Sequence, residues 1–168
     1  LSRGLGDVYK RQPLFERLKN ENARDIIDDV ILECCDIKRG VVERDEKESG
    51  ERALLNFGHT CGHAIENLYD FSGISHGEAV GIGMVMISRA GESAGITEPG
   101  TADRIAALLE KYGLKTQTDL PVSKIVHNMA FDKKRTANGI NLILLKKIGE
   151  SFIKPSSPDE VNALFGIK

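Results

Sequence analysis

Apolar residues recur at helical spacing along most of this 168-residue chain. The segment from 22 to 46 carries them at i, i+3 and i+4, which predicts one amphipathic helix. Its apolar positions are Ile26, Ile27, Val30, Ile31, Cys34, Ile37 and Val41. The segment 76–94 is apolar nearly all round and predicts a buried central helix, which Ser75 can cap. Similar patterns predict further helices over residues 13–21, 51–70, 99–112, 123–131 and 158–165.

The hydrophobic period changes near the C-terminus. Residues 141–145 and 151–154 are short β-type runs separated by a segment with one glycine, which predicts a β-hairpin. Ser157 and Pro158 suit the cap and the first position of the helix that follows. The sequence therefore predicts a mainly α domain with one small hairpin near 141–154 and no internal repeat.

The predicted helix over 51–70 has an unusual polar face. At about 100° per residue, Arg52, Asn56, His59 and His63 lie within about 60° of one another, opposite an apolar back. A solvated face would favour Lys and Glu instead, although two histidines at i and i+4 are often only a polar face. His76 then opens the next helix, from which its ring can point back. These donors suit a divalent metal with an open position for substrate.

Two glycines support a site on this helix. Gly58 and Gly62 fall inside the predicted segment, where each costs up to about 1 kcal/mol relative to alanine. Such a cost indicates the close approach of a ligand, a metal or another backbone. Two acids nearby are open to more than one interpretation. Glu66 could orient His63 or face water, and Glu78 could be a first-turn acid favoured by the helix dipole.

Composition excludes several classes of protein. A net charge of −2 argues against a basic surface for nucleic acid, and the longest apolar run, 79–87, is too short to span a membrane. Three cysteines without a C-x-x-C pair fit a reducing cytoplasm and not a disulfide framework. We expect residues 1–12 to be a translated adapter without native structure, and residues 13–168 to be one domain.

Two motifs together resemble the signature of the 3-dehydroquinate synthase family. They are N-F-G-H-T-C-G-H-A-I-E at 56–66 and S-H-G-E-A-V-G-I-G-M at 75–84. The match continues through Lys38, Val41, Val42, Asp45, Glu46, Glu48 and Arg52, and through 132–134 and 144–149. It covers residues 13–168, the C-terminal half of that family. The family's NAD-binding half would lie upstream, because this chain has no G-x-G-x-x-G and its Gly81-Ile82-Gly83 lies inside a predicted buried helix.

The resemblance implies a role for each polar residue. His59 and His76 would bind Zn²⁺ or Co²⁺. The family's third metal ligand is a glutamate upstream of this sequence, and no residue here can be assigned to that role. Glu16 and Glu21 could serve as the third ligand by their chemistry only. The catalytic and substrate-binding residues would be Lys38, Glu48, Arg52, Asn56 and His63. The substrate phosphate would be bound by Asn56 and His63 and by one of Lys133 and Lys134. Without the motif, the ordinary expectation is a solvated Lys38, a helix ion pair between Glu48 and Arg52, and a surface lysine pair.

The implied reaction uses NAD without net redox change. NAD transiently oxidises a secondary alcohol of 3-deoxy-arabino-heptulosonate 7-phosphate, phosphate leaves by β-elimination, the ketone is reduced, and an aldol step closes the ring of 3-dehydroquinate. We expect a cytoplasmic homodimer when complete, a small sugar phosphate as partner, and no activity from this piece alone. The alternatives are another sugar-phosphate cyclase, a metal-dependent polyol dehydrogenase, and a helical interaction module without chemistry.

Overall fold

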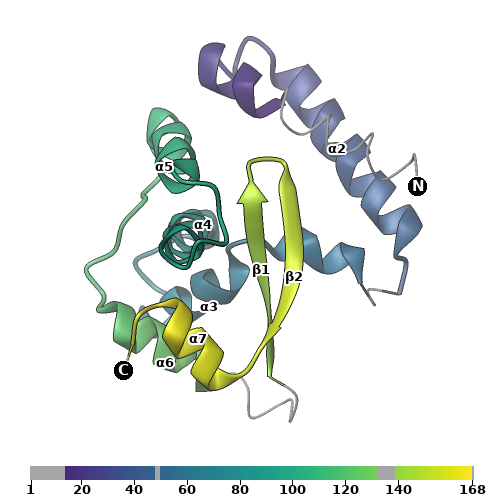
Figure 1. Ribbon diagram of the computed structural model, residues 1–168. Helices are drawn as coiled ribbons and strands as arrows, with labels where there is room; N and C mark the ends of the chain where they lie inside the picture. The colour runs from purple at the N-terminus through teal and green to yellow at the C-terminus, as the bar shows by residue number, and fades with distance from the viewer. Residues whose placement is uncertain (1–13, 48–49, 132–138, 168) are drawn as a thin grey trace.

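The computed structural model describes residues 14–47, 50–131 and 139–167 and shows a mainly helical domain with one hairpin (Figure 1). This confirms the predicted fold class. A first helix covers residues 14–20. The later elements are α2 (Ile27–Arg44), η1 (Glu51–Asn56), α3 (His59–Leu68), α4 (His76–Ser93), α5 (Thr101–Lys111), α6 (Val122–Phe131), β1 (Ile140–Lys147), β2 (Glu150–Ser156) and α7 (Pro158–Leu164). The interpretation of residues 1–12 lies outside the described residues.

Helix α4 is the buried centre, as its composition predicts. Its Ala79, Ile82, Val85 and Ile87 are at most 3% exposed, and α3, α5 and β1 pack around it (Figure 1). The helix begins with a capping box, in which the Ser75 side chain accepts from the backbone N–H of Glu78 while the Glu78 carboxylate accepts from that of Ser75. This cap places the start of α4, and therefore His76, at a defined point.

The single helix predicted over 51–70 is wrong. The structure has a 3-10 helix, η1, and then α3, with a break at Phe57 and Gly58. Phe57 has an extended ψ of 127°, and Gly58 has a φ of 82°, which places it in the left-handed region. A residue with a side chain rarely adopts that conformation, so glycine permits the break. Gly58 is therefore the residue before α3 and does not lie inside a helix.

The backbones of α3 and α4 approach each other very closely. A Cβ added to Gly83 of α4 would lie 2.2 Å from the Gly58 carbonyl oxygen and 2.9 Å from the Gly62 nitrogen. A Cβ added to Gly62 would lie 3.0 Å from the Val80 Cα. The glycines were expected to allow close approach of a ligand, a metal or another backbone, and the structure shows that the approaching group is another backbone. It brings the polar end of α3 next to the first turn of α4.

The hairpin forms where it was predicted. Strands β1 and β2 pair antiparallel, with Ile143 opposite Ile153, and Leu142 and Leu144 are at most 1% exposed. The Thr97 hydroxyl donates to the Leu145 carbonyl oxygen at 2.7 Å and ties the α4–α5 connection to β1. Helix α7 begins with the predicted cap, because the Ser157 side chain accepts from the Glu160 N–H and Pro158 follows.

The helix predicted over 22–46 is confirmed with tighter bounds, but its apolar face is mostly not covered. Within α2 the structure buries only Val41, while Ile27, Ile31 and Leu32 are 46%, 54% and 70% exposed. The helix stands apart from α4 and α5 and packs against η1 (Figure 1). Arg17 of the first helix forms ion pairs with two acids of α2, Asp29 at 2.9 Å and Glu33 at 3.1 Å, and so links the two helices.

None of the helices in the described part of the chain is both long and apolar enough to cross a membrane.

Candidate metal and substrate site

Three histidines from two helices lie together. His59 is the first residue of α3, His63 follows one turn later, and His76 is the first residue of α4. Their ring centroids are separated by 5.5 Å for His59 and His63, 5.3 Å for His59 and His76, and 5.8 Å for His63 and His76. The close packing of α3 against α4 causes this meeting. It agrees with the expectation that the third ring points back to the first helix.

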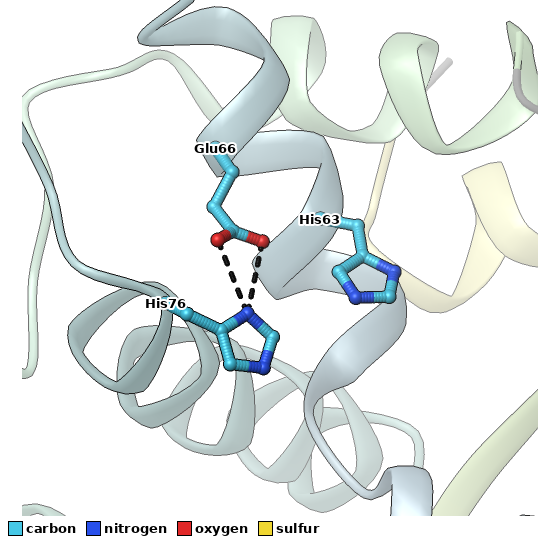
Figure 2. Close-up of side chains that lie close together, drawn as sticks. All are labelled: His63, Glu66 and His76. Carbon is cyan, nitrogen blue, oxygen red and sulfur yellow. Dashed lines mark hydrogen bonds and ion pairs between the residues drawn. The ribbon is translucent and has the colours of Figure 1, made fainter. Parts of the chain in front are cut away.

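Glu66 contacts His76 and not His63. Both of its carboxylate oxygens lie near His76 Nδ1, at 3.1 and 3.2 Å (Figure 2). The Glu66 side chain is 13% exposed, whereas that of His76 is 57% exposed. Glu66 was expected either to orient His63 or to face water, and the structure overturns both interpretations. The reason is tertiary: α4 brings its first residue to the side of α3 on which Glu66 lies.

This donor set fits a divalent metal. A metal–nitrogen distance of about 2.0–2.1 Å places the centroids of two tetrahedral imidazole ligands roughly 5.2 Å apart. The three measured separations, 5.3 to 5.8 Å, are close to this value. In addition, His63, Glu66 and His76 each offer one ligand atom within 4.8 Å of the others. The imidazole nitrogens and the carboxylate are ligands that zinc and cobalt accept.

A cavity of about 840 Å³ opens beside the histidines and is lined by Asn56, His59 and His63. The cavity is also lined by three side-chain amides that were not predicted from the sequence: Asn67, Asn128 and Asn141. The Asn67 amide nitrogen donates to the Asn128 side-chain oxygen at 3.0 Å, which links α3 to α6. Asn67 lies one turn after His63 on α3, so helical periodicity could have identified it. Asn128 and Asn141 come from distant segments, and only the tertiary structure brings them here.

Other predicted site residues are placed differently. Arg52 does not line this cavity among the described residues; its Nη1 donates to the Glu46 carbonyl oxygen at 3.3 Å. Its backbone N–H donates to the buried Asp45 carboxylate at 2.9 Å, which also accepts from Gly50. Lys38 is exposed on α2, a helix that packs against η1. The expectations for three residues lie outside the described part of the chain: Glu48, Lys133 and Lys134.

Two shifted pKa values describe the surroundings of the site. Hydrogen bonds from the Ser75 N–H and hydroxyl lower the pKa of Glu78, with help from Lys115 at 3.5 Å. Glu78 is therefore an ionised acid in the first turn of α4, as the sequence analysis suggested. Burial raises the pKa of Cys61 to about 12, so this thiol packs in the core behind the histidines as a neutral group.

Comparison with known proteins decides the family. The family described as "3-dehydroquinate synthase C-terminal" matches residues 7–135. The chain belongs to the 3-dehydroquinate synthase family. It is 49% identical over 160 residues to the 3-dehydroquinate synthase of Clostridium perfringens strain 13, covering 89% of this chain and 46% of that protein. It is 39% identical over 170 residues to the 3-dehydroquinate synthase of Enterococcus faecalis V583, covering 95% and 48%. The chain thus spans about half the length of the curated relatives that it matches.

Solved structures show the same fold as this member of the 3-dehydroquinate synthase family. A 2-epi-5-epi-valiolone synthase from Streptomyces hygroscopicus with NAD⁺ and Zn²⁺ bound has a TM-score of 0.72 at 19% identity, over 96% of this chain and 49% of that one. A 2-deoxy-scyllo-inosose synthase complexed with carbaglucose-6-phosphate, NAD⁺ and Co²⁺ has a TM-score of 0.65 at 24% identity, over 84% and 41%. At these identities the likeness supports the fold alone.

Proposed function

We propose that this chain is the metal- and substrate-binding half of a 3-dehydroquinate synthase. The complete enzyme converts 3-deoxy-arabino-heptulosonate 7-phosphate to 3-dehydroquinate and phosphate, a carbon–oxygen lyase reaction of aromatic amino acid biosynthesis. The observation that carries the proposal is the meeting of His59, His63 and His76 beside the 840 Å³ cavity in a chain of this family.

His59 and His76 would hold a divalent metal, Zn²⁺ or Co²⁺, with a third ligand from outside this chain. A metal held there would supply a Lewis acid for a substrate alcohol, and NAD, expected on the other half of the enzyme, would supply the hydride acceptor. His59 is half-buried with its Nδ1 3.4 Å from the Phe57 carbonyl oxygen, and His76 is held through its own Nδ1 by Glu66. Each ring is thus oriented through Nδ1, which directs Nε2 to a ligand.

The remaining residues of the site bind and orient the substrate. Asn56 and His63 line the cavity beside His59 and would donate hydrogen bonds to the leaving phosphate. The linked amides of Asn67 and Asn128 add donors and acceptors to the same wall, which suits a hydroxylated sugar. The family resemblance gives Arg52 the substrate carboxylate, which its planar fork of donors suits; in this structure its Nη1 donates to the Glu46 carbonyl oxygen, a hydrogen bond that substrate binding would have to replace.

The degree of identity supports dehydroquinate synthase over the other sugar-phosphate cyclases. The chain is 39–49% identical to proteins of that name but 19–24% identical to the 2-epi-5-epi-valiolone and 2-deoxy-scyllo-inosose synthases. We expect the complete enzyme to be a cytoplasmic homodimer. We also expect the isolated chain to show no turnover, because it carries no dinucleotide-binding motif.

The deciding experiment measures phosphate release by a completed enzyme. Residues 13–168 are joined to the N-terminal half of the C. perfringens relative and given NAD, Zn²⁺ and the seven-carbon substrate. We expect NAD-dependent release that His59→Ala abolishes. The matched control is His127→Ala, which removes an exposed imidazole of α6 outside the cluster and leaves release unchanged. Oxidation of polyols without phosphate release would place the chain among dehydrogenases, and a folded, metal-free, inactive protein would favour an interaction module.

A further inference from the structure

Glu66 is a partly buried acid whose partner is a histidine of the proposed metal site. Its side chain is 13% exposed, and in the described part of the chain His76 is the side chain with which it forms its hydrogen bonds. The two residues come from different helices, α3 and α4, and the carboxylate is directed at the first turn of α4 (Figure 2). An acid in that place is favoured by the positive end of the helix dipole.

The geometry determines which nitrogen of His76 carries hydrogen. An ionised carboxylate can only accept, so Nδ1, which lies 3.1 and 3.2 Å from its two oxygens, must donate. In a neutral imidazole the other nitrogen, Nε2, then carries the lone pair that a metal requires. Histidine ligands of metals are commonly oriented in this way by a carboxylate on the opposite nitrogen.

The difference in burial gives Glu66 a mechanical role as well. The ring of His76 is 57% exposed and lies at the end of a loop, so packing alone does not restrict its rotation. Glu66 is held on α3, which packs against α4 through the Gly62 and Gly83 contact. The carboxylate therefore anchors an exposed ring to the packed helix pair.

We propose that Glu66 is a positioning residue that fixes His76 as its Nδ1–H tautomer and keeps Nε2 available as a metal ligand. This rests on the proposed function in that His76 is taken to bind the metal. A different use of the same atoms is direct ligation, since Glu66, His63 and His76 lie within 4.8 Å of one another. The near-equal distances from both oxygens to one nitrogen favour the shared hydrogen bond, and the experiment separates the two roles.

The first readout needs no metal. Long-range ¹H–¹⁵N spectra of the metal-free chain, at a pH where imidazoles are neutral, report the tautomer of His76. We expect the Nδ1–H form in the wild type and in Glu66→Gln, whose amide oxygen still accepts, and loss of that preference in Glu66→Ala. The matched control is Glu98→Gln, the same change of charge on an exposed residue past the other end of α4. An Nε2–H form in the wild type would overturn the proposal.

The second readout is Zn²⁺ affinity by calorimetry on the same proteins, with His76→Ala beside them. We expect Glu66→Ala to weaken binding about 10–100-fold, Glu66→Gln to weaken it less, and Glu98→Gln to leave it unchanged. If Glu66→Gln abolished binding as completely as His76→Ala, Glu66 would be a ligand and the positioning role would be wrong. The last outcome is that His59→Ala and His76→Ala leave the Zn²⁺ affinity unchanged while the wild type shows the Nδ1–H tautomer of His76. The proposed metal site would then fail, but the Glu66–His76 pairing would stand.

Discussion

Substitution of Gly83 by alanine tests whether the α3–α4 contact builds the site. A Cβ at this position would lie 2.2 Å from the Gly58 carbonyl oxygen, and ordinary contact begins at 3.4 Å. The obstructing atoms belong to backbone and cannot rotate away, so the two helices must separate by roughly 1 Å. The same separation would move His76 away from His59 and His63.

Two effects of opposite sign determine the magnitude. Alanine is favoured over glycine inside a helix by about 0.8–1 kcal/mol. Overpacking a tight core costs typically about 1–3 kcal/mol and occasionally more. Because the Cβ added at position 83 would clash with both Gly58 and Gly62, we take the upper part of the overpacking range. We expect Gly83→Ala to lower the free energy of unfolding by about 2 kcal/mol net, or Tm by roughly 4–8 °C for a domain of this size.

Thermal and urea unfolding followed by circular dichroism measure this effect. Gly77→Ala is the control, because it makes the same change in the same helix at a position with nothing within 4 Å of the added Cβ. The control should be neutral or stabilised by up to about 1 kcal/mol. If the free energy of unfolding of Gly83→Ala were as high as that of Gly77→Ala, the reasoning about the backbone contact would be refuted.

Two further predictions concern thiols and pH. We expect alkylation of the native chain to modify the exposed Cys34 and Cys35 and to spare Cys61, which is buried and has a pKa raised to about 12; mass spectrometry with and without urea checks this, and rapid native labelling of Cys61 would contradict it. The backbone hydrogen bond from Ser157 lowers the pKa of Glu160 from its usual value. The stability that this hydrogen bond confers is therefore present above the unfolded-state pKa and is lost as the pH falls through the lower folded-state pKa. The difference in urea midpoint between wild type and Glu160→Ala should therefore shrink between pH 7 and pH 3, and a difference that grows on acidification would show the opposite linkage.

Local patterns predicted most of the elements. The caps of α4 and α7 were readable because Ser75 and Ser157 are each followed three residues later by a glutamate, an interaction that closes within one turn. The hairpin was readable from its change of period. The break at Gly58 could not be predicted from the sequence, because the apolar and polar positions keep helical spacing on both sides of it. The left-handed conformation of one glycine does not alter that spacing.

The site could be predicted only in part for a related reason. His59 and His63 share a helix, so their spacing places them on one face. The partner of Glu66 could not be assigned, because the choice between His63 and His76 depends on how α4 returns along α3. The amides of Asn128 and Asn141 join the cavity from α6 and β1, which no local spacing connects to α3.

The sequence by itself determined the helical class, the caps, the family motif and the identity of the candidate ligands, because each depends on interactions within a few residues or on a motif that is read directly. Only the tertiary structure decided where those ligands meet. Glycines on both helices let two backbones approach within a distance that no other residue allows, and this contact places His76 and Glu66 against each other. Distances between helices arise from packing across the whole core, and a linear pattern does not contain them.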